Sequence, residues 1–114
     1  MNIKIGSLDW TILKAKSHDP VLMVDGVECT GTTWLGRAEI YIDDALEGSR
    51  ALRTIAHELC HAYIFSTQAI RPETWDEESM CDFIAEYGKE ISTVAFNVYQ
   101  TLFVVDLNLE DLSK

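Results

Sequence analysis

The 114-residue chain is predicted to fold as an α+β protein: a small, mainly antiparallel sheet packed on two or three helices. Residues 2–44 contain short segments rich in β-branched and aromatic residues, separated by turn dipeptides. Across residues 49–70, apolar side chains recur at three- and four-residue steps without Pro or Gly, as a helix with one buried stripe requires. The same spacing returns after Pro72. At this length we expect one domain spanning residues 1–114, with the helix of residues 49–70 at its centre.

The longer strands are predicted at residues 2–5, at residues 8–16 and within residues 31–44. The first two strands are joined at Gly6-Ser7. In the third, apolar residues such as Ile40 and Ile42 alternate with polar ones, which is the period of a half-buried strand. These segments predict the sheet.

A turn and a short hairpin are predicted between these strands. His18-Asp19-Pro20 is typical of a turn, and residues 21–24 predict a short strand that ends at the hairpin dipeptide Asp25-Gly26. His18 is therefore expected on an exposed turn without a catalytic role.

The predicted helix over residues 49–70 contains the pentapeptide His57-Glu58-Leu59-Cys60-His61, an H-E-x-x-H pattern. In a helix the two histidines stand one turn apart on one face, a spacing that lets two imidazoles hold one metal ion. Glu58 lies about 100° round the helix from His57, so its carboxylate can reach a metal-bound water without binding the metal. The chain has three histidines, and two of them belong to this pattern. The pattern therefore indicates a metal site with His57 and His61 as ligands.

A second helix is predicted to begin after Pro72, with Thr74 and Glu77 forming a capping box. A two-histidine zinc site needs a third protein ligand, and Glu77 and Glu78 are the candidates. Glu78 and Asp82 stand one turn apart, so Glu78 can bind the metal while Asp82 accepts a hydrogen bond from a ligand histidine. Glu77 lies nearer the apolar arc predicted from Met80, Ile84 and Tyr87, and it has the capping role. Glu78 is therefore preferred, and Glu77 remains the alternative.

A third helix is predicted after Gly88 and is expected to pack behind the two helices of the metal site. Residues 106–114 mix leucines with acidic residues and form either a docking segment or a frayed end. The third helix is predicted from the helical spacing of Ile91, Val94, Ala95, Val98, Tyr99 and Leu102.

The two motifs resemble those of the gluzincin metallopeptidases, which carry H-E-x-x-H on one helix and E-x-x-x-D on the next. The second motif here is Glu78-Ser79-Met80-Cys81-Asp82. The short length and the strand before the first motif are similar to the compact ImmA/IrrE-type metallo-endopeptidases and related phage-encoded proteins. That group commonly has Ala-Asn where this chain has Cys81-Asp82. The resemblance covers residues 34–88 and implies Zn²⁺ bound by the ligand set His57, His61 and Glu78, with Glu58 as general base.

The resemblance implies zinc-dependent hydrolysis of a peptide bond in a protein or peptide substrate. In such enzymes an edge strand beside the site can pair with an extended substrate, and the strand within residues 31–44 is the candidate here. Two alternatives remain: a deformylase-like site with Cys29 in place of Glu78, and a non-catalytic, metal-stabilised interaction or regulatory protein of phage or prophage type. Candidate donors to the developing oxyanion are Tyr41, Tyr63, Tyr87 and Arg71.

Composition limits the partners. The formal net charge of −10 argues against binding to a nucleic-acid backbone, which favours a basic surface. The N-terminal sequence lacks the apolar stretch of a signal peptide, and no apolar run reaches membrane-spanning length, so no membrane association is expected. Three cysteines, an odd number, do not form a disulfide framework, and we expect a reducing cytoplasmic location.

Overall fold

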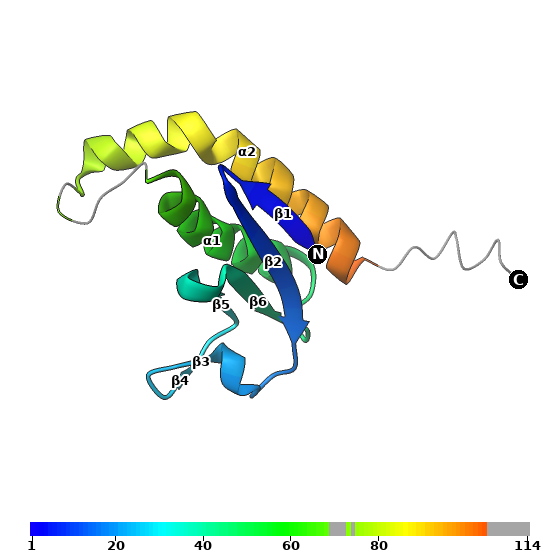
Figure 1. The fold of residues 1–114 in the computed structure, drawn as a ribbon. Coiled ribbons are helices and arrows are strands. Elements are labelled where there is room, and N and C mark those ends of the chain that lie inside the picture. The colour runs from blue at the N-terminus through cyan, green and yellow to red at the C-terminus, as the bar shows by residue number, and fades with distance from the viewer. Residues whose placement is uncertain (69–72, 74, 105–114) are drawn as a thin grey trace, which may run out of the picture.

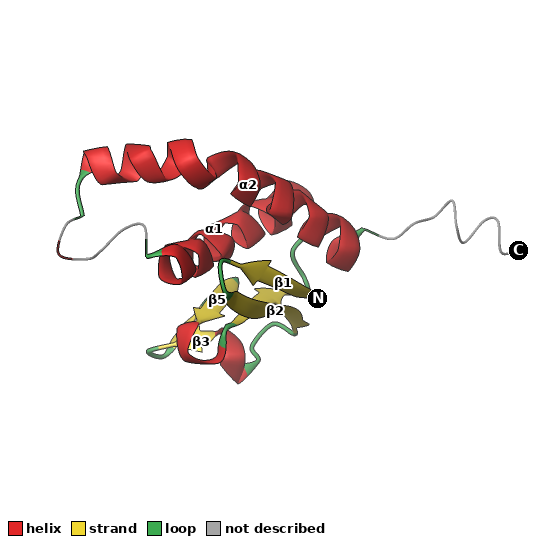
Figure 2. Cartoon of the chain, turned by 45° about the horizontal axis from the view of Figure 1, so that its top comes forward, coloured by secondary structure: helices red, strands yellow, loops and turns green. Residues whose placement is uncertain are grey.

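The computed structural model describes residues 1–68, 73 and 75–104, and this part of the chain has an α+β fold (Figure 1). A four-stranded sheet of order β1-β2-β6-β5 packs against the helix α1 (Gly48–Thr67), and α1 also packs against the helix α2 (Glu77–Phe103). Figure 2 shows α1 between the sheet and α2, so the helix with the H-E-x-x-H pattern is central, as predicted. The strands of this sheet are β1 (Asn2–Ile5), β2 (Leu8–Ala15), β5 (Gly31–Trp34) and β6 (Glu39–Asp43).

The sheet is mixed, because two antiparallel hairpins are joined by one parallel pair. β1 and β2 form the first hairpin through Gly6, whose φ of +61° is readily adopted by glycine. β5 and β6 form the second, and β2 runs parallel to β6 between them. The predicted strands at residues 2–5 and 8–16 are confirmed.

The segment of residues 31–44 contains two strands, where one was predicted. The 3₁₀ turn Leu35–Arg37 and the left-handed conformation of Ala38 reverse the chain before β6 begins. Ile40 and Ile42 are buried, which confirms the period of two. β6 lies inside the sheet, so its predicted edge position is wrong, and β5 is the edge strand beside α1.

The predicted strand over residues 21–24 is wrong in its first half. Asp19 caps the short 3₁₀ helix Pro20–Leu22 by accepting a hydrogen bond from the Val21 amide, and Pro20 fixes a helical φ. The Asp25-Gly26 turn is confirmed, with both φ angles positive as a type I′ turn requires. This turn joins the two remaining strands, β3 (Met23–Val24) and β4 (Val27–Glu28).

Helix α2 begins two residues later than the predicted capping box. The Asp76 side chain accepts a hydrogen bond from the Ser79 amide at 2.7 Å, so Asp76 is the N-cap. Thr74, Arg71 and the segment of residues 106–114 lie outside the described residues. The capping box with Glu77 is therefore replaced by an Asp cap.

Helix α2 continues through Gly88, so the separate third helix predicted after this residue is wrong. A helical glycine weakens a helix by about 1 kcal/mol but keeps its backbone hydrogen bonds, and buried side chains on both sides of Gly88 hold the helix against the core. Phe83 is buried while Ile84 is 52% exposed, so the apolar face is rotated from the predicted arc of Met80, Ile84 and Tyr87. The buried residues of α2 are Phe83, Ile91, Ala95 and Val98.

The hydrophobic core extends over both sides of α1. Ile12, Ile40 and Ile42 of the sheet, Ile55 and Leu59 of α1 and the buried residues of α2 form one cluster. This packing fixes the rotation of α1, so the face that neither the sheet nor α2 covers carries the histidines. None of the helices in the described ranges is long and apolar enough to span a membrane.

Candidate metal and catalytic site

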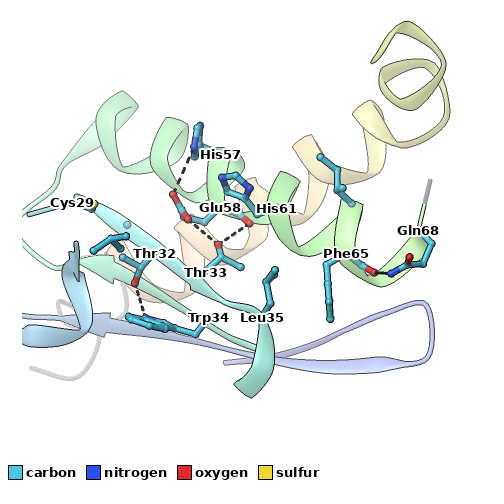
Figure 3. Close-up of a pocket in the computed structure, with 13 residues that line it drawn as sticks. Cys29, Thr32, Thr33, Trp34, Leu35, His57, Glu58, His61, Phe65 and Gln68 are labelled. Atoms are coloured by element: carbon cyan, nitrogen blue, oxygen red, sulfur yellow. Dashed lines mark hydrogen bonds and ion pairs between the residues drawn. The ribbon is translucent and has the colours of Figure 1, made fainter. Parts of the chain in front are cut away.

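His57 and His61 lie side by side on the exposed face of α1, as the motif predicts. Their ring centroids are 5.0 Å apart with the planes at 74°, and the His57 side chain is 68% exposed. Two imidazoles presented one turn apart in this way are suitable as two ligands of one zinc ion. Figure 3 shows both rings above β5.

Glu58 turns in the other direction and is buried against β5. Its side chain is only 8% exposed, and one carboxylate oxygen accepts a hydrogen bond from the Thr33 hydroxyl at 2.7 Å. The other oxygen is 4.0 Å from Nε2 of His57. In the part of the chain that the structure describes, no Lys or Arg pairs with this carboxylate. A carboxylate is thus held in a nearly dry position beside two histidines (Figure 3).

Gly31 makes this close approach between β5 and α1 possible. A Cβ atom at Gly31 would lie 2.8 Å from Cγ2 of Thr54 and 2.9 Å from Cγ of Glu58, closer than such atoms can stand. The motif itself identified neither Gly31 nor Thr33 as part of the site. The available signal was the glycine at the start of a strand, which often marks a close backbone approach, with Thr33 on the same face two residues later.

Two cavities open on this centre. The larger has a volume of about 770 Å³, and His57, Glu58 and His61 line it. The smaller, of about 370 Å³, shares His57, Glu58 and Gly31 with it. The two cavities therefore form one groove between α1 and β5, with the histidines and Glu58 at its middle (Figure 3).

The structure does not bring Glu78 to the histidines. Glu77, Glu78 and Asp82 are exposed on the first turns of α2, which lie beyond the C-terminal end of α1 (Figures 1 and 2). Within residues 1–68, 73 and 75–104, no three His, Cys, Asp or Glu side chains stand close enough to hold a metal ion together. The assignment of Glu78, or of Glu77, as third ligand therefore stays a prediction.

Cys29, the alternative third ligand, lines both cavities and is half-buried. Its thiol lies 3.7 Å from the carbonyl oxygen of Val27. The structure therefore places this cysteine at the groove, whereas Cys81 is exposed on α2 and Cys60 is half-buried on α1, where burial raises its pKa.

None of the described candidate oxyanion donors lines either cavity. Tyr63 is buried between α1 and α2, where its ring packs against Tyr87, and burial raises its pKa. Burial and a hydrogen bond to Glu39 raise the pKa of Tyr41 on β6. His18 lies on an exposed turn, as predicted, and pairs with Glu28 at 3.0 Å.

Comparison of the chain with protein-family models, with curated proteins and with solved structures found no match. The assignment of function therefore depends on the site itself.

Proposed function

We propose that this protein is a zinc-dependent peptide hydrolase. The observation that supports this proposal most directly is the Glu58 carboxylate, buried against Thr33 beside two exposed histidines one turn apart. A carboxylate in this position, at the middle of an open groove, suits a general base that acts on a water molecule held at the histidines.

His57 and His61 would hold the ion, with Glu78 as the predicted third ligand. Zinc, when bound, acidifies a water molecule and polarises the carbonyl that the water attacks. Glu58 would take the proton of that water and return it to the leaving amine. The Thr33 hydroxyl, which donates to Oε1 of Glu58 at 2.7 Å, would hold the carboxylate in one orientation.

Within the described part of the chain, β5 pairs with no strand other than β6, and this free edge supports an extended peptide as the substrate. The Thr30 carbonyl accepts a hydrogen bond from the Asp43 amide, so Thr30 and Thr32 form the hydrogen-bonded pairs with β6. The main-chain groups of Gly31 and Thr33 therefore point away from β6, toward the free edge. A substrate strand that pairs with these groups would lie along the groove beside Glu58. The three free cysteines are consistent with the proposed cytoplasmic location.

Metal content tests the ligand set. We expect about one zinc per chain in the wild type by elemental analysis, and loss of zinc in His57→Ala and His61→Ala. Loss in Glu78→Ala together with retention in Glu77→Ala supports Glu78 as the third ligand. Loss in Cys29→Ala with retention in Glu78→Ala would move the third ligand to Cys29. A wild-type protein that takes up no zinc contradicts the proposal.

Glu58→Gln tests catalysis separately from metal binding. The variant should retain zinc and lose hydrolysis of an unfolded protein substrate by at least about a hundredfold, because general-base catalysis contributes on the order of 10²–10⁴. Glu47→Gln is a suitable control, since Glu47 is exposed beside the same helix and its side chain makes no capping hydrogen bond. Zinc binding without hydrolysis in the wild type would instead favour the non-catalytic, metal-stabilised interaction protein.

A further inference from the structure

The two ends of the groove between α1 and β5 differ in chemistry. Beyond His61 the walls are mainly apolar, and two of their large hydrophobic side chains, Leu35 and Phe65, are 43% and 37% exposed. Exposed apolar side chains that gather in one cavity mark a binding surface for another apolar group. This end is lined by Leu35, Ile64 and Phe65, with the polar side chain of Gln68 beside Phe65.

The opposite end, beyond His57, is polar and contains a cation. Thr30, Thr54 and Arg53 line the smaller cavity there. Arg53 is exposed, and in the described ranges it forms no ion pair. Among the described residues, no other Lys or Arg lines either cavity, and the chain has a net charge of −10. An unpaired guanidinium at the end of a groove is suited to binding a carboxylate.

The dimensions of the groove match a short extended peptide. Along α1 the lining residues run from Arg53 through His57 and His61 to Ile64, a distance of eleven helical steps that spans about 16 Å. An extended chain covers this length with about five residues. β5 follows the same direction, since Gly31 contacts Thr54 and Glu58 while Leu35 lines the apolar end. A bound segment can therefore reach both ends at once.

We propose that the groove binds an extended peptide with a large apolar side chain at the Leu35 and Phe65 end and a carboxylate at Arg53. The two groups lie on opposite sides of the histidines, three to four residues apart on the peptide. The carboxylate belongs to an Asp or Glu side chain or to the C-terminus of the peptide. This inference names the substrate class for the proposed function and rests on it, but the binding it describes can be measured without hydrolysis.

The test measures binding of fluorescent alanine-based heptapeptides to the full chain in EDTA by anisotropy. The reference peptide contains Phe and Glu separated by two or three residues and has an amidated C-terminus. Matched peptides carry Lys in place of Glu, Ala in place of Phe, or a free C-terminus in place of Glu. Each peptide with two internal test residues is made with these residues in both orders along the chain. We expect the Phe/Glu or the Phe/free C-terminus peptide to bind at least tenfold more tightly than the Phe/Lys and Ala/Glu peptides. The tighter binder of these two peptides shows whether the carboxylate bound at Arg53 is a side chain or a C-terminus.

Substitutions at Arg53 and Leu35 test which end of the groove binds the carboxylate and which binds the apolar side chain. Arg53→Glu should invert the preference for Glu over Lys, whereas Arg50→Glu, an exposed arginine of the same helix that lines neither cavity, should leave it unchanged. Leu35→Ala should reduce the preference for Phe, and Phe96→Ala is its control, since Phe96 is 51% exposed outside both cavities. Equal binding of the Glu and Lys peptides, or absence of measurable binding, would overturn the proposal.

Hydrolysis of the same peptides with added zinc separates this inference from the proposed function. Selective binding without cleavage would refute the hydrolase and leave the peptide groove standing. Cleavage that is indifferent to the apolar and acidic positions would support the hydrolase and refute the groove specificity.

Discussion

Replacing Thr33 by valine removes one hydroxyl and keeps the shape of the side chain. That hydroxyl lies 2.7 Å from Oε1 of Glu58 and 3.2 Å from the Glu58 carbonyl oxygen. The shorter contact is to a carboxylate whose side chain is 8% exposed, so water cannot easily replace the lost donor. A hydrogen bond to a charged group contributes about 1.5–3 kcal/mol, and we expect Thr33→Val to lower the free energy of unfolding by about 2 kcal/mol.

Urea unfolding monitored by tryptophan fluorescence measures this loss, and a double-mutant cycle with Glu58→Ala assigns it to the carboxylate. The carbonyl acceptor of Glu58 persists in the alanine background, so the coupling energy isolates the side-chain bond. Thr33→Ser should restore most of the stability. Thr11→Val is the control, because Thr11 is half-buried on β2 and no side-chain hydrogen bond of this residue is found among the described residues.

Additive effects of Thr33→Val and Glu58→Ala, within about 0.5 kcal/mol, would refute the reasoning. An equally large loss in Thr11→Val would also refute it, because a general intolerance of valine in the sheet would then explain the result.

Further predictions concern the glycine, the helix cap and the cysteines. Gly31→Ala should destabilise the fold by about 1–3 kcal/mol in urea unfolding, because its Cβ would overlap Thr54 and Glu58, whereas Gly36→Ala has open space and should change little. The hydrogen bonds of Ser79 lower the pKa of Asp76, so its stabilisation is present above the ordinary value of 3.8 and is lost as the pH falls through the lowered pKa. Asp76→Asn should therefore flatten the acid side of the stability profile measured by circular dichroism, and an unchanged profile contradicts this. With iodoacetamide followed by mass spectrometry, exposed Cys81 should react faster than Cys60, whose pKa is raised by burial, and the reverse order would be inconsistent with the structure.

The features predicted well from the sequence are those set by local periodicity. The helix around His57 and the burial of Ile40 and Ile42 follow from spacings of three to four and of two residues. The Asp25-Gly26 turn follows from the positive φ angles that these residues accept. Each of these signals lies within a few residues of the structure that it predicts.

The errors arose where distant parts of the chain decide the outcome. Gly88 was expected to end a helix, but buried side chains on both sides of it pack into the core and α2 is continuous. β2 and β6 pair in parallel, and the paired residues, such as Thr11 and Glu39, lie 28 positions apart in the sequence. No local turn therefore predicts this pairing. The edge position of β5 follows from that pairing, so the sequence could not show that β5, and not β6, is the edge strand within residues 31–44.

The site combines features that a purely structural helix would not need. A buried carboxylate without a Lys or Arg partner in the described ranges is unfavourable, and a glycine in a strand weakens the strand. An apolar side chain at position 58 with a larger residue at position 31 would fill the same space with greater stability. The chain instead uses Gly31 to admit Glu58 and Thr33 to orient it, directly beneath the two histidines. Local choices that oppose stability tend to gather at functional sites, and this pattern supports the proposal that Glu58 is the general base.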